Sequence, residues 1–128
     1  MEKTRDIKLV RMINAANALF ADVKTQTFPA DMIILFGSVA KNNINEYSDM
    51  DICIVSDDDL TIRQKRDIER YFNTMTQEEF KLDFVYCDKD KLKNGTQVFE
   101  NIRKEGRVIY GKLSSHSADG LGRCNILP

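Results

Sequence analysis

Two acidic residues, Asp49 and Asp51, are separated by a single residue in the run DMDICIV. In a β-strand, side chains at positions i and i+2 share a face, so these two carboxylates would project together. Two anions that close repel each other unless water solvates both, one takes up a proton, or a divalent cation lies between them. The spacing therefore raises the possibility of a metal site.

A third carboxylate, Asp83, interrupts the later run KLDFVY, in which polar and apolar residues alternate as in a half-buried strand. If this strand lies beside the strand of Asp49 and Asp51, the three carboxylates converge on one patch. Hard oxygen ligands of this kind suit Mg²⁺ or Mn²⁺. Two such ions about 3.5–4 Å apart are the usual arrangement in phosphoryl-transfer enzymes.

Gly37 and Ser38 directly follow the apolar run MIILF. Glycine allows backbone amides to approach a phosphate closely, and the serine hydroxyl adds a hydrogen-bond donor. We expect this turn to hold the phosphates of a nucleotide while the carboxylates hold the metal. The simpler interpretations are a solvated strand end for Asp49 and Asp51, an outward-facing residue for Asp83, and a helix N-cap for Ser38.

Hydrophobic periodicity predicts the helices and strands that must position these residues. We expect an amphipathic helix over about 6–24, a second long helix around Ile68, Tyr71, Phe72 and Met75, and a shorter helix over 97–106 ending at Gly106. The side chains of SDDD at 56–59 should cap the second helix. The expected strands are 32–36, 49–55, 81–87 and 107–110, the first of them central because it is apolar throughout.

The composition predicts one small soluble domain. The chain has 128 residues, and its 19 Lys and Arg against 20 Asp and Glu give a formal net charge of −1, so no chain-wide basic field attracts nucleic acid or membrane. It shows no leader pattern and no apolar run of about 18 residues. Three cysteines fit neither a disulfide framework nor paired zinc ligands. We expect a cytoplasmic protein with a domain over 1–111 and an irregular tail over 112–128.

The stretch FGSVAKNNINEYSDMDICIV, followed by KLDFVY, resembles the signature of the nucleotidyltransferase superfamily that shares the DNA polymerase beta fold. Gly-Ser, ten residues, Asp-x-Asp and a later strand Asp make up the motif. The chain looks most like the minimal nucleotidyltransferases, the MNT proteins encoded beside HEPN-domain partners. The likeness runs from about 31 to 86, and the predicted order of elements agrees over 6–110. It implies an α/β (α+β) fold, a small mixed sheet flanked by helices.

The resemblance also implies roles for individual residues. Asp49 and Asp51 would be metal ligands, Asp83 a further ligand or the base for the acceptor hydroxyl, and Gly37 and Ser38 the nucleotide-phosphate turn. Many relatives carry Arg-Gly where this chain has Lys41 and Asn42, which is one departure from the family pattern. A lysine keeps the positive charge for a phosphate but loses the fork geometry of arginine.

The activity implied is transfer of a nucleoside monophosphate, AMP from ATP, to a hydroxyl of a partner protein, with two Mg²⁺ or Mn²⁺ ions and release of pyrophosphate. The partner would be a HEPN-type toxin, for which this chain would be the antitoxin. Two alternatives stay open at this point. The chain could neutralise its partner by binding alone, or it could modify a small molecule, as aminoglycoside nucleotidyltransferases do.

Overall fold

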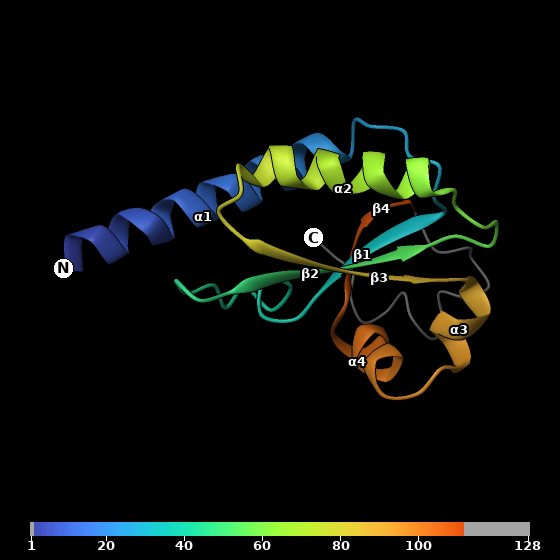
Figure 1. The fold of residues 1–128 in the computed structure, drawn as a ribbon. Helices are drawn as coiled ribbons and strands as arrows, with labels where there is room; N and C mark the ends of the chain where they lie inside the picture. The colour runs from blue at the N-terminus through green and yellow to red at the C-terminus, as the bar shows by residue number, and fades with distance from the viewer. Residues whose placement is uncertain (1, 112–128) are drawn as a thin grey trace.

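The computed structural model describes residues 2–111, which form a four-stranded mixed sheet with helices on both faces (Figure 1). In chain order the elements are α1 (Glu2–Val23), β1 (Met32–Phe36), β2 (Asp49–Val55), α2 (Ile62–Thr76), β3 (Lys81–Cys87), α3 (Lys89–Asn94), α4 (Val98–Glu105) and β4 (Arg107–Tyr110). The α+β class expected from the sequence is confirmed.

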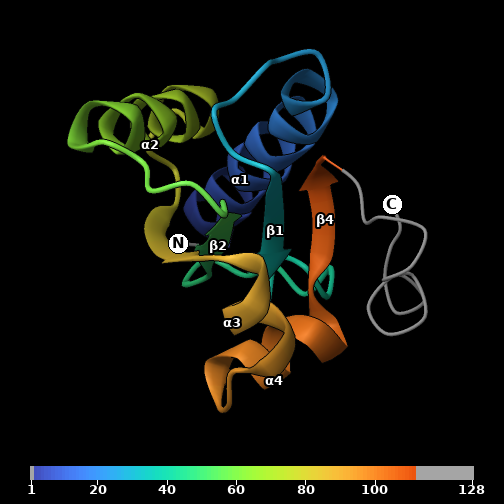
Figure 2. The same ribbon diagram turned by 90° about the vertical axis from the view of Figure 1, so that its right-hand side faces the viewer.

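The strands are arranged in the order β3-β2-β1-β4. β1 is antiparallel to both of its neighbours, β2 and β4, whereas β2 and β3 are parallel. A parallel pair needs a long crossover connection, and α2 supplies it. Figure 2 shows β1 between β2 and β4, so the prediction that the first strand is central is confirmed.

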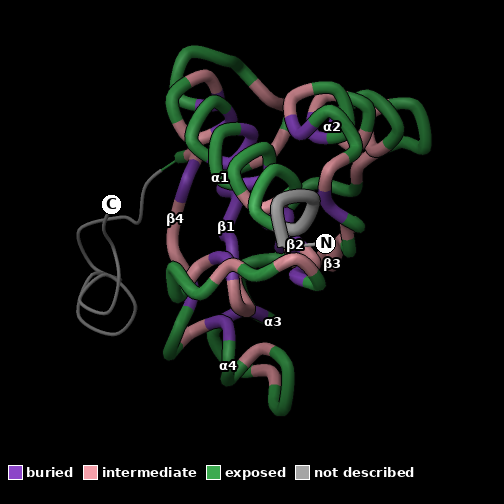
Figure 3. Tube along the Cα trace, turned by 90° about the vertical axis from the view of Figure 1, so that its left-hand side faces the viewer, coloured by how far each residue is buried: buried purple, intermediate pink, exposed green. Residues whose placement is uncertain are grey.

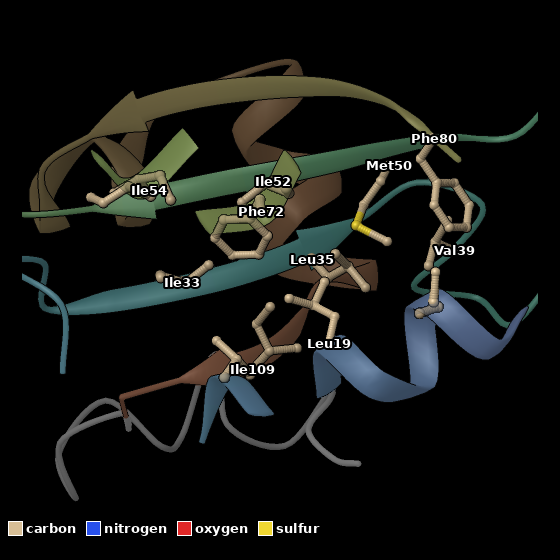
Figure 4. Close-up of a cluster of buried hydrophobic side chains, with 14 of the residues drawn as sticks. Leu19, Ile33, Leu35, Val39, Met50, Ile52, Ile54, Phe72, Phe80 and Ile109 are labelled. Carbon is tan, nitrogen blue, oxygen red and sulfur yellow. The ribbon is translucent and has the colours of Figure 1, made fainter. Parts of the chain in front are cut away.

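The sheet is covered by hydrophobic side chains on both faces, which explains why β1 is apolar throughout and why β2 is apolar after Asp51. One cluster lies beneath α1 and α2 and includes Leu19, Leu35, Ile52 and Phe72, which are fully buried (Figure 4). The other lies beneath α3 and α4, and its members are Met32, Ile34, Cys53, Val55, Leu92 and Ile102. Figure 3 shows the resulting burial of the central strands.

All four predicted strands have the predicted bounds, but the helices differ in detail. The N-cap of α2 is Thr61 and not a residue of the SDDD run, because Thr61 and Gln64 form a reciprocal capping box. Residues 56–59 instead belong to the loop, where the Ser56 hydroxyl donates a hydrogen bond to the Asp58 carbonyl. The prediction that this run caps the helix was therefore wrong.

The helix predicted over 97–106 is α4, with Gly106 as its C-cap. The short helix α3 was not predicted; the Asp88 side chain caps it by accepting from the Lys91 backbone N–H. The tail predicted over 112–128 lies outside the described residues. Within residues 2–111, no helix combines the length and the hydropathy of a membrane-spanning segment.

Two cysteines that lie far apart in the sequence are neighbours in the fold. Cys53 on β2 is buried, Cys87 on β3 is half-buried, and their sulfurs are 3.7 Å apart as free thiols. The single hydrogen bond between the two sulfurs raises the pKa of the Cys53 thiol, which burial raises further, and lowers the pKa of the Cys87 thiol. Sequence spacing alone could not reveal this pair.

Candidate active site

The register of the parallel ladder places Asp51 of β2 directly beside Asp83 of β3. Asp49, two residues before Asp51, shares its face of the sheet. That face is the one away from α1 and α2, because the intervening Met50 and the following Ile52 are buried in the cluster beneath those helices. The structure therefore brings all three predicted carboxylates to one face at one end of the sheet.

Gly37 lies against the Asp51 carboxylate. Phe36 pairs with Asp51 in the antiparallel ladder, and Gly37 follows with a φ of 82°, in the left-handed region that favours glycine. A Cβ atom at this position would lie 3.3 Å from the Asp51 Cγ and closer still to one of its oxygens. The turn can therefore pass this close to the carboxylate only because residue 37 has no side chain.

Ser38 is held at the base of the loop that joins β1 to β2. Its hydroxyl donates a hydrogen bond of 3.3 Å to the hydroxyl of Ser48, and its carbonyl accepts one of 2.9 Å from the Asn43 N–H. The Ser48 hydroxyl in turn accepts from the Asn45 N–H at 2.9 Å. The loop is thus closed on itself immediately before Asp49.

Ser48 is a site residue that sequence reasoning missed. It is one of two buried polar residues in the described part of the chain, and it connects the Gly37-Ser38 turn to the first carboxylate. The only signal in the sequence is its position three residues after Asn45, a spacing typical of local hydrogen-bonded turns. Its contact with Ser38 spans ten residues and has no sequence signature.

The three carboxylates affect one another electrostatically. Burial, the charge of Asp83 and the charge of Asp49, in that order, raise the pKa of Asp51 above its usual value. Each of these effects disfavours the ionised form of Asp51. A positive charge placed among the three side chains would reverse the effect, so the site is electrostatically suited to a cation.

Lys41, which is predicted to contact a phosphate, forms an ion pair with a side chain of α4 in this structure. Its Nζ forms an ion pair of 3.1 Å with the Glu105 carboxylate at the end of α4, and both side chains are about half exposed. Exposed pairs of this kind contribute only about 0–1 kcal/mol, so an incoming phosphate could displace Glu105. The role predicted for Lys41 stays a prediction.

Comparison with known protein families identifies the family of this chain. Residues 17–114 match the family model described as polymerase beta, nucleotidyltransferase. The chain belongs to this family. The matched residues include the Gly37-Ser38 turn, Asp49, Asp51 and Asp83, so the polymerase beta-type nucleotidyltransferase domain covers the whole candidate site. None of the curated proteins searched matches the chain.

The chain is similar to chains in solved structures of toxin–antitoxin complexes. A chain in the crystal structure of a toxin–antitoxin with AMP-PNP is 19% identical, with a TM-score of 0.50 over 83% of this chain and 77% of that one. A structure of the tri-AMPylated Shewanella oneidensis HEPN toxin in complex with MNT antitoxin gives 17% identity and a TM-score of 0.47, over 85% and 76% of the two chains. At 19% identity, the likeness to the first of these structures concerns the fold.

Divalent metals and nucleoside triphosphates are typical of nucleotidyltransferases. The carboxylates of Asp49, Asp51 and Asp83 are the kind of hard oxygen donors that divalent ions prefer. The carboxylate oxygens, the raised pKa of Asp51 and the missing Cβ at Gly37 all favour a cation at this place. Within residues 2–111, however, no three acidic, cysteine or histidine side chains are already grouped to hold a metal. Asp51 and Asp83 are the pair that the parallel ladder places side by side.

Proposed function

We propose that this nucleotidyltransferase moves AMP from ATP to a hydroxyl group of a partner protein, and that the partner is a HEPN-type toxin which the transfer silences. The observation that carries the proposal is the pairing of Asp51 with Asp83 on adjacent parallel strands, beside a glycine turn that touches Asp51. A strand-end carboxylate that served only solubility would not need two like charges next to it.

Asp49 and Asp51 would hold divalent ions, Mg²⁺ or Mn²⁺, with Asp83 as a further ligand. When bound, the ions neutralise phosphate charge and lower the pKa of the acceptor hydroxyl. The backbone of Gly37 and the hydroxyl of Ser38 would orient the triphosphate, and Lys41 would add a positive charge once released from Glu105.

Asp83 is suited to accept the proton of the acceptor hydroxyl. It is exposed on the edge strand β3, whereas Asp49 and Asp51 are half-buried on the interior strand β2, so an acceptor on a large partner can reach it. In the reaction, the acceptor oxygen forms a bond to the α-phosphorus, the bond to pyrophosphate breaks, and the hydroxyl proton passes to Asp83.

The protein partner is supported by the resemblance of the motif to the MNT proteins and by the fold shared with the toxin–antitoxin structure that contains AMP-PNP. Tyrosine, serine or threonine would each supply the acceptor hydroxyl. Tyrosine, with a pKa near 10, loses its proton most readily. An attached AMP adds bulk and negative charge, which would obstruct a basic RNA-binding cleft.

The test is intact-mass spectrometry of the proposed partner, the product of the neighbouring gene, after incubation with the protein, Mg²⁺ and each nucleoside triphosphate in turn. We expect the mass of one or more AMP groups on the toxin with ATP, and none with the Asp49→Asn protein. Asp58→Asn is the matched control, because it removes an aspartate from a loop at the far end of β2. Unchanged toxin mass with the wild-type protein would contradict the proposal.

The second candidate is an antitoxin that neutralises its partner by binding alone. It is favoured by one observation, the absence of a preformed three-ligand metal group within residues 2–111. The two functions differ in how the Asp49→Asn protein behaves in cells that express the toxin. Rescue of growth by Asp49→Asn equal to that by the wild type, at unchanged toxin mass, would favour binding alone.

A further inference from the structure

Two thiols lie on the same two strands, and on the same face of the sheet, as the candidate carboxylates. On β2, Cys53 follows Asp51 by two residues, and on β3, Cys87 follows Asp83 by four, so each cysteine shares the face of its carboxylate. Cys53 is part of the hydrophobic cluster beneath α3 and α4, and Cys87 packs against that cluster. The thiol pair and the carboxylate pair therefore belong to one ladder, formed by the adjacent strands β2 and β3 (Figure 1).

The two thiols are close to each other but differ in exposure. Their sulfurs are 3.7 Å apart and both are free; Cys53 is fully buried, whereas Cys87 is half-buried. A small oxidant in the solvent therefore reaches Cys87 more readily than Cys53. The hydrogen bond with Cys53 lowers the pKa of the Cys87 thiol, which supports the same order because the thiolate is the form that reacts.

We propose that Cys87 is an oxidation site for hydrogen peroxide, that Cys53 converts the oxidised sulfur into a Cys53–Cys87 disulfide, and that this bond slows the nucleotidyltransferase. The effect on transfer rests on the proposed function, whereas the oxidation itself does not. Disulfides that form in reducing cell compartments are usually transient and act as redox sensors. The bond would accordingly form under peroxide stress and be removed by thiol reductants.

The oxidation takes place in two steps. First, the Cys87 sulfur bonds to one peroxide oxygen, the O–O bond breaks, and the other oxygen leaves as water with the thiol proton, which gives a sulfenic acid. Next, the Cys53 sulfur bonds to the Cys87 sulfur, the S–O bond breaks, and a second water leaves with the Cys53 proton. Two thiols are thus oxidised to one disulfide, and one peroxide is reduced to two water molecules.

The disulfide requires β3 to slide along β2. In the parallel register, Cys53 pairs with Val85 and Cys87 pairs with Val55, so the two cysteines are diagonal neighbours. With strands about 4.8 Å apart and a rise of about 3.3 Å per residue, their Cα atoms are roughly 8 Å apart. The Cα atoms of disulfide-bonded cysteines usually lie about 4.4–6.8 Å apart, so β3 must slide by about 1–2 Å for the bond to form.

A slide of β3 displaces Asp83 relative to Asp51. Asp83 is on β3 and is paired with Asp51 across the ladder, so the moving strand carries this carboxylate with it. A misplacement of about 1 Å at a catalytic site can lower the rate about 100-fold. We therefore expect the reduced protein, in which the two carboxylates are in register, to transfer at least about tenfold faster than the oxidised protein.

The first test detects the bond itself. The full-length wild type and its Cys124→Ser variant, which lacks the third cysteine, are treated with hydrogen peroxide, digested, and analysed by mass spectrometry with and without a reductant. We expect linked peptides that contain Cys53 and Cys87 in both proteins, and their separation on reduction. In Cys53→Ala, a 1,3-diketone reagent should label a sulfenic acid at Cys87, and thermal melts check that this variant is folded. Absence of the linked peptides, or a link to Cys124 instead, would overturn the proposal.

The second test measures the effect of the bond on the site. Backbone amide NMR signals of β3, including that of Asp83, should shift on oxidation, and the rate of transfer to the toxin should fall and recover with reductant. Cys87→Ala is the matched control, in which peroxide should change neither. Linked peptides with unchanged amide signals and an unchanged rate would overturn the regulatory part. If the reduced protein transfers no AMP while the linked peptides form, the proposed function fails and the oxidation site stands.

Discussion

Replacing Gly37 with alanine should lower the free energy of unfolding by about 2–5 kcal/mol, from two separable sources. The first is the left-handed backbone at φ 82°, which costs a residue with a Cβ about 1–2 kcal/mol. The second is overpacking against the Asp51 carboxylate, whose Cγ would lie 3.3 Å from the new Cβ and whose oxygen would lie closer; forced contacts of this kind cost about 1–3 kcal/mol.

Urea unfolding of a double-mutant cycle separates the two sources. In an Asp51→Ala background the side chain ends at Cβ, which would lie 3.6 Å from the new Cβ, an ordinary contact distance. The Gly37→Ala change should then cost only the backbone part, about 1–2 kcal/mol. The difference between the two backgrounds, about 1–3 kcal/mol, is the coupling between Gly37 and Asp51.

Asp51→Asn is the control that distinguishes shape from charge, because asparagine keeps the size of the side chain and removes its charge. The full cost of Gly37→Ala should persist in this background. An equal cost in all three backgrounds would refute the steric reasoning. A cost relieved by asparagine as much as by alanine would show that charge, and not close packing, links Gly37 to Asp51.

Three further outcomes are expected. Because folding raises the pKa of Asp51, the stability contributed by the neutral carboxyl group is present below its usual pKa of 3.8 and is lost as pH rises through the pKa of the folded protein. Asp51→Asn should therefore raise the melting temperature near pH 7 but not near pH 3, which thermal melts at the two pH values can show. Mg²⁺ should raise the melting temperature of the wild type more than that of Asp51→Asn, with EDTA as the control. In transfer assays, Asp83→Asn should lower kcat far more than it weakens ATP binding measured by calorimetry.

The strands and the convergence of the three carboxylates could be predicted from the sequence because their signals are local. Alternation in KLDFVYC and the apolar run MIILF fix each strand within a few residues, and the i, i+2 rule places Asp49 and Asp51 together. The alignment of Asp83 with Asp51 needed one further assumption, that the two strands are neighbours. The observed ladder confirms that assumption.

The features that were missed depend on contacts between distant residues or on competition between local signals. Three aspartates before a helix suggest a cap, but Thr61 has the glutamine three residues later that completes a capping box. The Ser38–Ser48 bond and the Lys41–Glu105 pair join segments whose approach is decided by the fold of the loop and of α4. Nothing in the spacing of these residues encodes their contact.

Because β3 is an edge strand of the sheet, the charge of Asp83 also affects whether the protein associates with itself. The outer side of an edge strand presents unpaired backbone groups that can pair with another chain, and proteins commonly prevent this with exposed charges. Among the described strands, β3 ends the sheet, and its exposed residues are Lys81 and Asp83. Removing the Asp83 charge therefore removes a barrier to self-association, so inactive Asp83 variants should be compared with the wild type only after their monomeric fraction has been isolated.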